Sequence, residues 1–313
     1  MALRAVTSSE RRSLERLMAA GGVRNLSPNT LAGYAADWRS FGAWCRSNKL
    51  QPFPATTEAV LCYLHHLVAT GHKVSTARRH AAAIRHHYRR RGLASPVTQK
   101  SIDFLAAVKR LRGEQPNQKR PLTLEQLRQI VAPLTRTKRA TRNKAILLVG
   151  WASALRRANL AALTVEDITI VEAGLVIAVR HEKQDRKGDG RIVAIPRGND
   201  RELCPVIALE EWLKLRGNKP GPVFTRRYRG KVRRLLPKQI GVIVKNAVRS
   251  IGLDPRDYSG HSLRSGCITA LLDAHVDALL VAAHSGHHSL EVLRTYHRRV
   301  NPFDGNVLKR VGF

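Results

Sequence analysis

The chain has 313 residues, of which 43% are hydrophobic and 25% are charged. This length exceeds one domain of about 100–200 residues, and the apolar fraction suffices for packed cores, which excludes a small module or a disordered chain. Lysine and arginine number 55 against 23 acidic residues, a formal net charge of +32. Residues 1–120 carry net +15 and residues 121–313 net +17, so the charge is not confined to a tail. This distribution indicates a polyanionic partner such as nucleic acid.

No segment approaches the about 20 consecutive apolar residues that cross a bilayer. The first 20 residues also lack the continuous apolar stretch of a secretory signal. We therefore expect a cytoplasmic, nucleoid-associated protein with no membrane partner.

The first part of the chain predicts a helical domain. Apolar residues recur at helical spacing after the capping sequence Ser27-Pro-Asn-Thr30, and this stripe consists of Leu31, Tyr34, Trp38, Phe41 and Trp44. Aromatic residues at such spacing are more often core residues than groups that stack on bases. Further helices are predicted at about 57–70, 75–92 and 98–112.

The predicted helix at 75–92 is rich in arginine. Four of its arginines are candidates for contact with DNA phosphates: Arg78, Arg79, Arg85 and Arg89. The alternative is a basic face that is only exposed to solvent, which is the usual interpretation of a run of charged residues. The excess of positive charge along the chain favours contact with DNA instead.

The segment 113–121 is polar and contains Gly113, Pro116 and Pro121, which indicates a linker between domains 1–112 and 122–313. After it, a capped helix begins near Thr123, and an apolar helix follows at about 138–155. Short segments rich in Val and Ile predict an antiparallel sheet: Ile168 to Val171, Leu175 to Arg180 and Arg191 to Ile195. Several helices complete a mixed α/β second domain, so the fold class is mainly α with a small antiparallel β-sheet.

The sequence has no dinucleotide fingerprint, no phosphate-binding loop and no carboxylate cluster that could hold two metal ions. We expect no cofactor. The histidines His284, His287 and His288 invite a zinc interpretation, but they lack the i, i+4 spacing of zinc helices, so we expect no metal. Cleavage of a phosphodiester without metal requires fixed cations, a nucleophile and an acid for the leaving oxygen. Six side chains could supply these groups, namely Arg156, Lys183, His261, Arg264, His287 and Tyr296.

In order and spacing, these six residues resemble the signature of the tyrosine recombinases, the phage-integrase family. The sequence from Ser27-Pro-Asn-Thr30 through Tyr34 and Asp37 to Trp44-Cys45 is also similar to the start of that family's SAM-like core-binding domain. The resemblance therefore covers most of the chain. It implies a site-specific DNA recombinase or integrase with two domains around duplex DNA.

The resemblance also implies the chemistry. Tyr296 attacks the scissile phosphate and forms a 3'-phosphotyrosyl link, which stores the bond energy for rejoining without metal or ATP. Arg156, and not its neighbour Arg157, pairs with Arg264 to clamp the phosphate oxygens. The histidines His261 and His287 hydrogen-bond the phosphate and assist proton transfer, and Lys183 protonates the leaving 5'-oxygen, although Lys187 in the same loop could serve instead.

Two positions depart from the family pattern, because Ala154 stands where glycine is usual and Asn159 where an acidic residue is usual. Alternative functions are a DNA-binding protein that keeps the fold without catalysis, and a type IB topoisomerase. Members of the family act as homo-tetramers on recombination sites, some with an accessory directionality factor. The resemblance implies that the apolar C-terminal tail from Pro302 to Phe313 docks into a neighbouring subunit, with packing on its own domain as the alternative.

Overall fold

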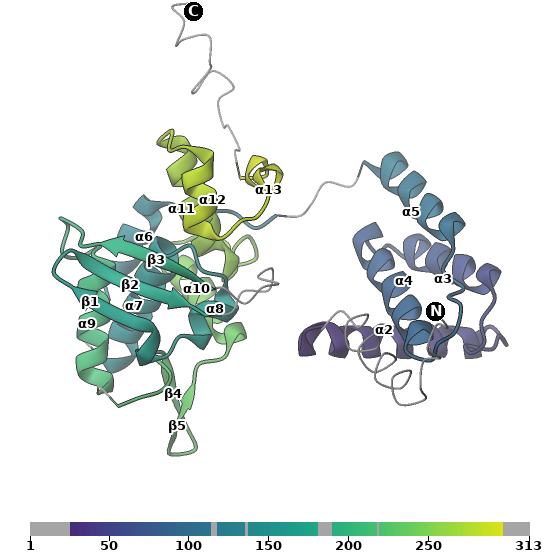
Figure 1. The fold of residues 1–313 in the computed structure, drawn as a ribbon, viewed down its shortest axis with the longest axis horizontal. Coiled ribbons are helices and arrows are strands. Elements are labelled where there is room, and N and C mark those ends of the chain that lie inside the picture. Colours follow the sequence, from purple (N-terminus) through teal and green to yellow (C-terminus); the bar gives the residue numbers. More distant parts are fainter. Residues whose placement is uncertain (1–25, 114–117, 135–136, 181–189, 218, 297–313) are drawn as a thin grey trace, which may run out of the picture. The chain divides into compact units, whose positions relative to one another are not determined.

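The structure is a computed structural model that describes residues 26–113, 118–134, 137–180, 190–217 and 219–296. It divides into two compact units, Met1–Asn117 and Gln118–Phe313 (Figure 1). Both are mainly helical, as predicted. In the described ranges, no helix has the length and apolar character needed to span a membrane.

The first unit is a bundle of four helices over its described residues: Pro28–Ser47 (α2), Thr57–Ala69 (α3), Val74–Arg89 (α4) and Gln99–Arg112 (α5). Helix α2 begins as the sequence predicts, with Pro28 in its first turn and the Ser27 hydroxyl accepting a hydrogen bond from the Thr30 amide. Helix α4 ends three residues before the predicted limit of 92. The aromatic stripe is split: Phe41 is fully buried, Trp38 and Trp44 pack at the edge of the core, and Leu31 is exposed.

The second unit contains eight described α-helices: Leu124–Val131 (α6), Lys138–Ala152 (α7), Arg157–Ala162 (α8), Pro205–Arg216 (α9), Pro237–Ser250 (α10), His261–Asp273 (α11), Ala278–Ser285 (α12) and Leu290–Arg294 (α13). Helix α6 starts with a capping box between Thr123 and Gln126, which confirms the predicted start. The 3-10 turn Val165–Asp167 (η1) leads into the sheet.

Three strands form the predicted antiparallel sheet in the order β1-β2-β3: Ile168–Val171 (β1), Gly174–Val179 (β2) and Arg191–Pro196 (β3). Val179 at the end of β2 pairs with Arg191 at the start of β3. The segment with Lys183 that joins these strands in the sequence, 181–189, lies outside the described residues. A second antiparallel hairpin, Thr225–Tyr228 (β4) and Lys231–Arg234 (β5), was not predicted.

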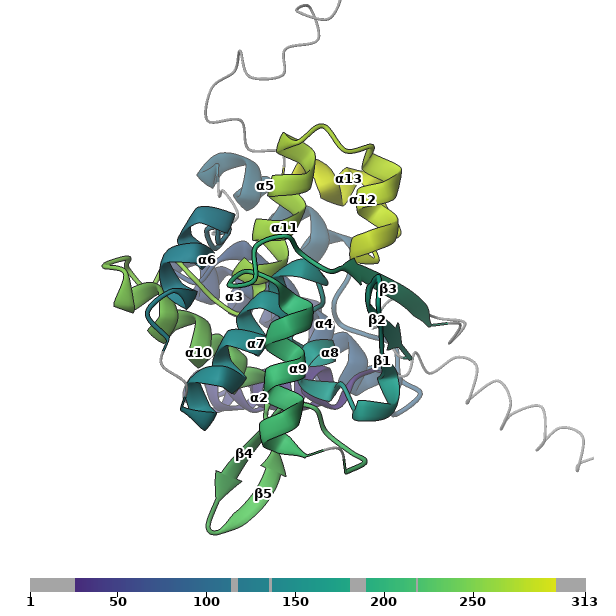
Figure 2. The ribbon, with the colours of Figure 1, turned by 90° about the vertical axis from the view of Figure 1, so that its left-hand side faces the viewer.

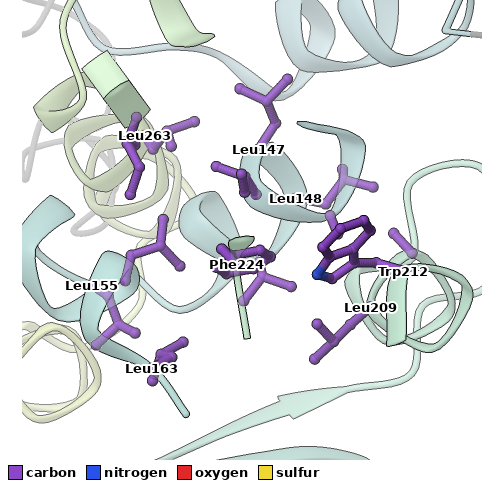
Figure 3. Packing of buried hydrophobic residues seen from close by; sticks show 14 of the residues in the cluster. Leu147, Leu148, Leu155, Leu163, Leu209, Trp212, Phe224 and Leu263 are labelled. Carbon is purple, nitrogen blue, oxygen red and sulfur yellow. The ribbon is translucent and has the colours of Figure 1, made fainter. Parts of the chain in front are cut away.

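Helix α7 runs through the middle of the second unit, with the β1-β2-β3 sheet on one side and α6 and α10 on the other (Figure 2). The β4-β5 hairpin projects from the end of the unit opposite α12 and α13. In Figure 3, Leu147 and Leu148 of α7 lie between Leu263 of α11 and Trp212 of α9. A central apolar helix therefore fixes the other elements relative to one another.

The predicted extension of α7 to residue 155 is wrong, because the helix ends at Ala152. Ala154 has a φ of 48°, in the left-handed region, and this reverses the chain direction before Arg156. Apolar residues continue through Leu155, which is buried, so the hydrophobic pattern does not mark the end of the helix.

We predict that Gly266→Ala destabilises the second unit by about 2–4 kcal/mol. A Cβ atom at Gly266 in α11 would overlap the Leu122 carbonyl oxygen and would lie 2.7 Å from the Trp151 indole nitrogen. Gly241→Ala in α10 is the control, because its Cβ would make only ordinary contacts of 3.7 Å or more. Urea unfolding should show a loss for the first variant and no loss for the second; equal stability of the two would contradict the packing argument.

Candidate active site

Arg156 occupies the turn between α7 and α8. It is the N-cap residue of α8, with extended backbone, and its side chain is half-buried. The left-handed turn at Ala154 directs the chain so that the Ala154 carbonyl faces α11 and Arg156 follows two residues later. Burial and the charge of Arg264 lower the pKa of both His261 and His287, and the positive charge of Arg156 lowers it further.

Arg264 of α11 is almost completely buried, with 1% of its surface exposed. One terminal nitrogen donates to the carbonyls of Ala154, at 2.7 Å, and Ser285, at 2.5 Å. The other lies 2.8 Å from Nε2 of His287. These three acceptors are neutral, and through them the guanidinium ties α11 to the turns after α7 and α12.

His287 follows a turn that requires glycine. Gly286 ends α12 with a φ of 70°, and the His287 amide donates back to the Ala282 carbonyl. Because arginine can only donate, Nε2 of His287 accepts from Arg264, and Nδ1 therefore carries the proton that it donates to the Ser285 hydroxyl, 2.8 Å away. Burial and the charges of Arg264 and Arg156 lower the pKa of His287 to about 3, so the ring is neutral.

Tyr296 lies between the two histidines. Its hydroxyl is 3.1 Å from Nε2 of His261, and its ring centre is 5.6 Å from that of His287. His261 begins α11, and the Ser259 hydroxyl accepts from its amide. Partial removal of the ring from water lowers the pKa of His261, and the guanidinium charges of Arg264 and Arg156 lower it further. A neutral imidazole thus faces the phenol.

The structure therefore brings together five of the six predicted residues: Arg156, His261, Arg264, His287 and Tyr296. Lys183 lies outside the described residues. The strand after its loop is nevertheless joined to the site, because Arg191 at the start of β3 donates to the His284 carbonyl at 2.7 Å. Among the described residues, no group of three or more His, Cys, Asp or Glu side chains could hold a metal ion.

The basic helix α4 exposes Arg78, Arg79 and Arg89, whereas Arg85 is half-buried. Arg79 makes two hydrogen bonds to the Asp37 carboxylate of α2, at 2.7 and 2.9 Å. Asp37 is buried and also lies 3.2 Å from Nε2 of His80. Arg79 thus neutralises a buried carboxylate, while its side chain remains 55% exposed.

The β4-β5 hairpin is a basic element that the sequence reasoning missed. Six of its ten residues from 225 to 234 are Arg or Lys, and the guanidinium of Arg226 stacks 4.8 Å from the ring centre of Tyr228. A hollow of about 760 Å³ lies between this hairpin and the ends of α7 and α9. Among the described residues that line it, nine are Arg or Lys and none is acidic. The dense positive charge on both sides of Arg229-Gly230 is the sequence feature that could have indicated this element.

Family models match both units of the chain. Residues 120–301 match the phage integrase family, and residues 21–91 match the N-terminal SAM-like domain of phage integrases. An integrase/recombinase xerD homolog of Selenomonas ruminantium is 31% identical over 297 residues, which cover 92% of this chain and 86% of that protein. Recombinase cre of Escherichia phage P1 is 24% identical over 87% of this chain and 84% of that protein.

Solved structures share the fold. The XerH site-specific recombinase bound to its difH substrate has a TM-score of 0.64 at 17% identity, over 91% of this chain and 78% of that chain. A lambda integrase dimer bound to a core site has a TM-score of 0.60 at 16% identity, over 93% of this chain and 96% of that chain.

The chain belongs to the phage integrase family. It is a site-specific tyrosine recombinase, an enzyme that breaks and rejoins DNA, with a SAM-like N-terminal domain and an integrase catalytic domain.

We predict that Ser285→Ala slows strand cleavage about tenfold, which corresponds to the loss of one hydrogen bond that orients His287. Ser265→Ala is the matched control, because the buried Ser265 hydroxyl donates to the Ser262 carbonyl within α11 and does not contact His287. Single-turnover cleavage of a nicked duplex measures the effect. Equal rates for the two variants would show that the Ser285 hydroxyl does not orient the imidazole.

Proposed function

We propose that this recombinase cleaves DNA through a covalent bond between Tyr296 and the 3'-phosphate. The phenolic oxygen attacks phosphorus, the bond to the 5'-oxygen breaks, and a 3'-phosphotyrosyl link and a free 5'-hydroxyl result. The observation that carries the proposal is the 3.1 Å contact between the Tyr296 hydroxyl and a neutral His261, which can accept the phenolic proton. Rejoining reverses the step and needs neither metal nor ATP.

Arg156 and Arg264 would bind the non-bridging oxygens of the phosphate. Their guanidinium groups stabilise the charge that develops in the transition state, and lysine could not reproduce the paired hydrogen bonds. The phosphodiester would offset the positive charges that depress the pKa of His287. Nε2 of His287 would then take up a proton, give up its hydrogen bond from Arg264 and donate to the phosphate instead.

Lys183 is our candidate for the acid that protonates the departing 5'-oxygen, with Lys187 of the same loop as the alternative. The contact from Arg191 to the turn at His284 supports this assignment, because it anchors the end of that loop beside the phosphate site.

The proposed DNA contacts lie on both units. In the N-terminal unit they are Arg78, Arg79, Arg85 and Arg89 of α4, which would bind backbone phosphates. In the catalytic unit the β4-β5 hairpin is added, because a narrow two-stranded ribbon with six cationic side chains suits a polyanion. We also propose the domain limits that the sequence predicts: a DNA-binding domain at 1–112, a linker at 113–121 and a catalytic domain at 122–313.

We further propose that the protein acts as a homo-tetramer on double-stranded recombination sites at the nucleoid. The tail from Pro302 to Phe313 lies outside the described residues, and its sequence contains Phe303, Val307, Leu308, Val311 and Phe313. A suitable receptor exists on the catalytic unit: an apolar hollow of about 450 Å³ between β3, α11 and α12, lined in part by Trp151, Ile195 and Leu271. A directionality factor is a further partner that the family resemblance predicts.

Tyr296→Phe should bind DNA as the wild type does but form no covalent adduct. The measurement uses nicked duplexes from the DNA that flanks the gene and detects adducts that resist SDS. Tyr258→Phe is the matched control, because within the described part of the chain the Tyr258 hydroxyl makes one hydrogen bond, which it accepts from the Gln126 side chain at 3.4 Å.

An adduct with Tyr296→Phe would assign the nucleophile to another residue. Tight binding by the wild type with no adduct would favour a non-catalytic DNA-binding protein. Relaxation of supercoiled plasmids without a recombination site would favour the topoisomerase alternative.

Arg78→Ala and Arg79→Ala should differ in their effects. Loss of Arg78 should weaken DNA binding and reduce the slope of log affinity against log salt by about one. Loss of Arg79 should in addition destabilise the N-terminal unit by about 1–3 kcal/mol, because the buried Asp37 loses its bidentate partner. Fluorescence anisotropy at several salt concentrations and urea unfolding measure the two effects. A fully stable Arg79→Ala protein would contradict the structural part of this prediction.

A further inference from the structure

Arg157 follows the catalytic Arg156 and begins helix α8, and its side chain runs toward the start of α11 rather than along its own helix. A Cβ atom added at Gly260 would lie 3.3 Å from both Cβ and Cδ of Arg157. Its terminal nitrogen would lie 4.0 Å from a Cβ atom at Gly241 in α10. The aliphatic stem therefore packs over Gly260, the residue directly before His261.

The backbone of Gly260 does not explain why glycine stands there. Its φ of −60° and ψ of −14° are ordinary helical values that any residue can adopt. What a side chain at this position would meet is the stem of Arg157, at a distance shorter than usual carbon contacts. The absence of a side chain at Gly260 thus permits the close packing of Arg157 against the segment that positions His261.

The placement of Arg157 is also unfavourable for its own helix. Cations near a helix N-terminus oppose the helix dipole, and the first turn of α8 contains no acidic residue that would compensate. A residue that is unfavourable for its own helix in this way is expected where function requires it. The guanidinium charge acts on the active site instead, because Arg157 is one of the three arginines whose charges lower the pKa of His261.

We propose that Arg157 is a positioning residue of the catalytic centre. Its stem packs against Gly260 and thereby places His261 opposite Tyr296, and its positive charge disfavours protonation of the imidazole that accepts the phenolic proton. The inference rests on the proposed function, since it assigns His261 as the proton acceptor. The groups that face this imidazole are Arg156 and Arg157 of α8, Arg264 of α11, and His287 and Tyr296.

The sign of the pH effect follows from this assignment. Cleavage requires neutral His261, so activity is lost as the pH falls through the pKa of that group. Removal of the Arg157 charge raises this pKa, and activity is then lost at a higher pH. Loss of the Arg157 charge therefore lowers the rate on the acid side of the profile and leaves the rate at higher pH unchanged.

The test compares two variants that both keep an unbranched stem and differ in charge. Arg157→Met keeps an unbranched stem without the charge, and Arg157→Lys keeps the charge. Single-turnover formation of the phosphotyrosyl adduct at saturating DNA is measured as a function of pH. We expect the acid limb to move to higher pH in Arg157→Met and to stay in place in Arg157→Lys. Arg249→Met, in the exposed last turn of α10, controls for the loss of one positive charge.

A titration of the His261 imidazole by NMR in the DNA-free protein, assigned with His261→Gln, gives the same comparison without catalysis. A higher pKa of His261 in Arg157→Met, with no change in the other variants, supports the inference even where no adduct forms. The absence of an adduct would then count against the proposed function and not against this inference. An unchanged titration and acid limb in Arg157→Met overturn it. An equal shift in Arg157→Lys or Arg249→Met also overturns it, because the position and charge of Arg157 would then not be the cause.

Discussion

The catalytic unit depends on one buried cation, the guanidinium of Arg264. Burial of a charge is expensive unless hydrogen bonds satisfy it, and here two backbone carbonyls and one imidazole do so. The carbonyls belong to Ala154, after the central helix α7, and to Ser285, at the end of α12. One side chain therefore joins two segments that are more than 100 residues apart in the sequence. The same bonds fix the two turns from which Arg156 and His287 emerge, so contacts that stabilise the fold also position residues of the candidate site.

Ala154 illustrates how a departure from the family pattern is accommodated. A left-handed conformation costs an alanine about 1–2 kcal/mol relative to glycine. Its methyl group is fully buried against the cluster that contains Cys267 and Ile268, which offsets about 0.8 kcal/mol. The conformation persists because it presents the Ala154 carbonyl to Arg264. The remaining strain lies in the turn at Ala154, which positions Arg156.

The sequence predicted the elements that have a clear hydrophobic period, such as α3, α5 and the β1-β2-β3 sheet. It missed the β4-β5 hairpin because its strands are mostly Arg and Lys, and the single Tyr and single Val give no alternation of apolar and polar residues. It extended α7 too far because composition does not reveal the positive φ of Ala154. The order of Arg156, His261, Arg264, His287 and Tyr296 indicated a common site. Bonds such as that between Arg79 and Asp37, 42 residues apart, depend on tertiary packing and have no local signature.

The concentration of guanidinium groups explains why imidazoles, rather than carboxylates, flank Tyr296. A carboxylate beside Arg156 or Arg264 would remain ionised, pair with the arginine and compete with the phosphate. Histidine in the same field stays neutral, as the lowered pKa values of His261 and His287 indicate. Before DNA binds, the positive field makes His261 a weak base. In the mechanism that we propose, a bound phosphodiester would partly cancel that field and strengthen the base, so proton removal from Tyr296 would be favoured mainly when the scissile phosphate is in place.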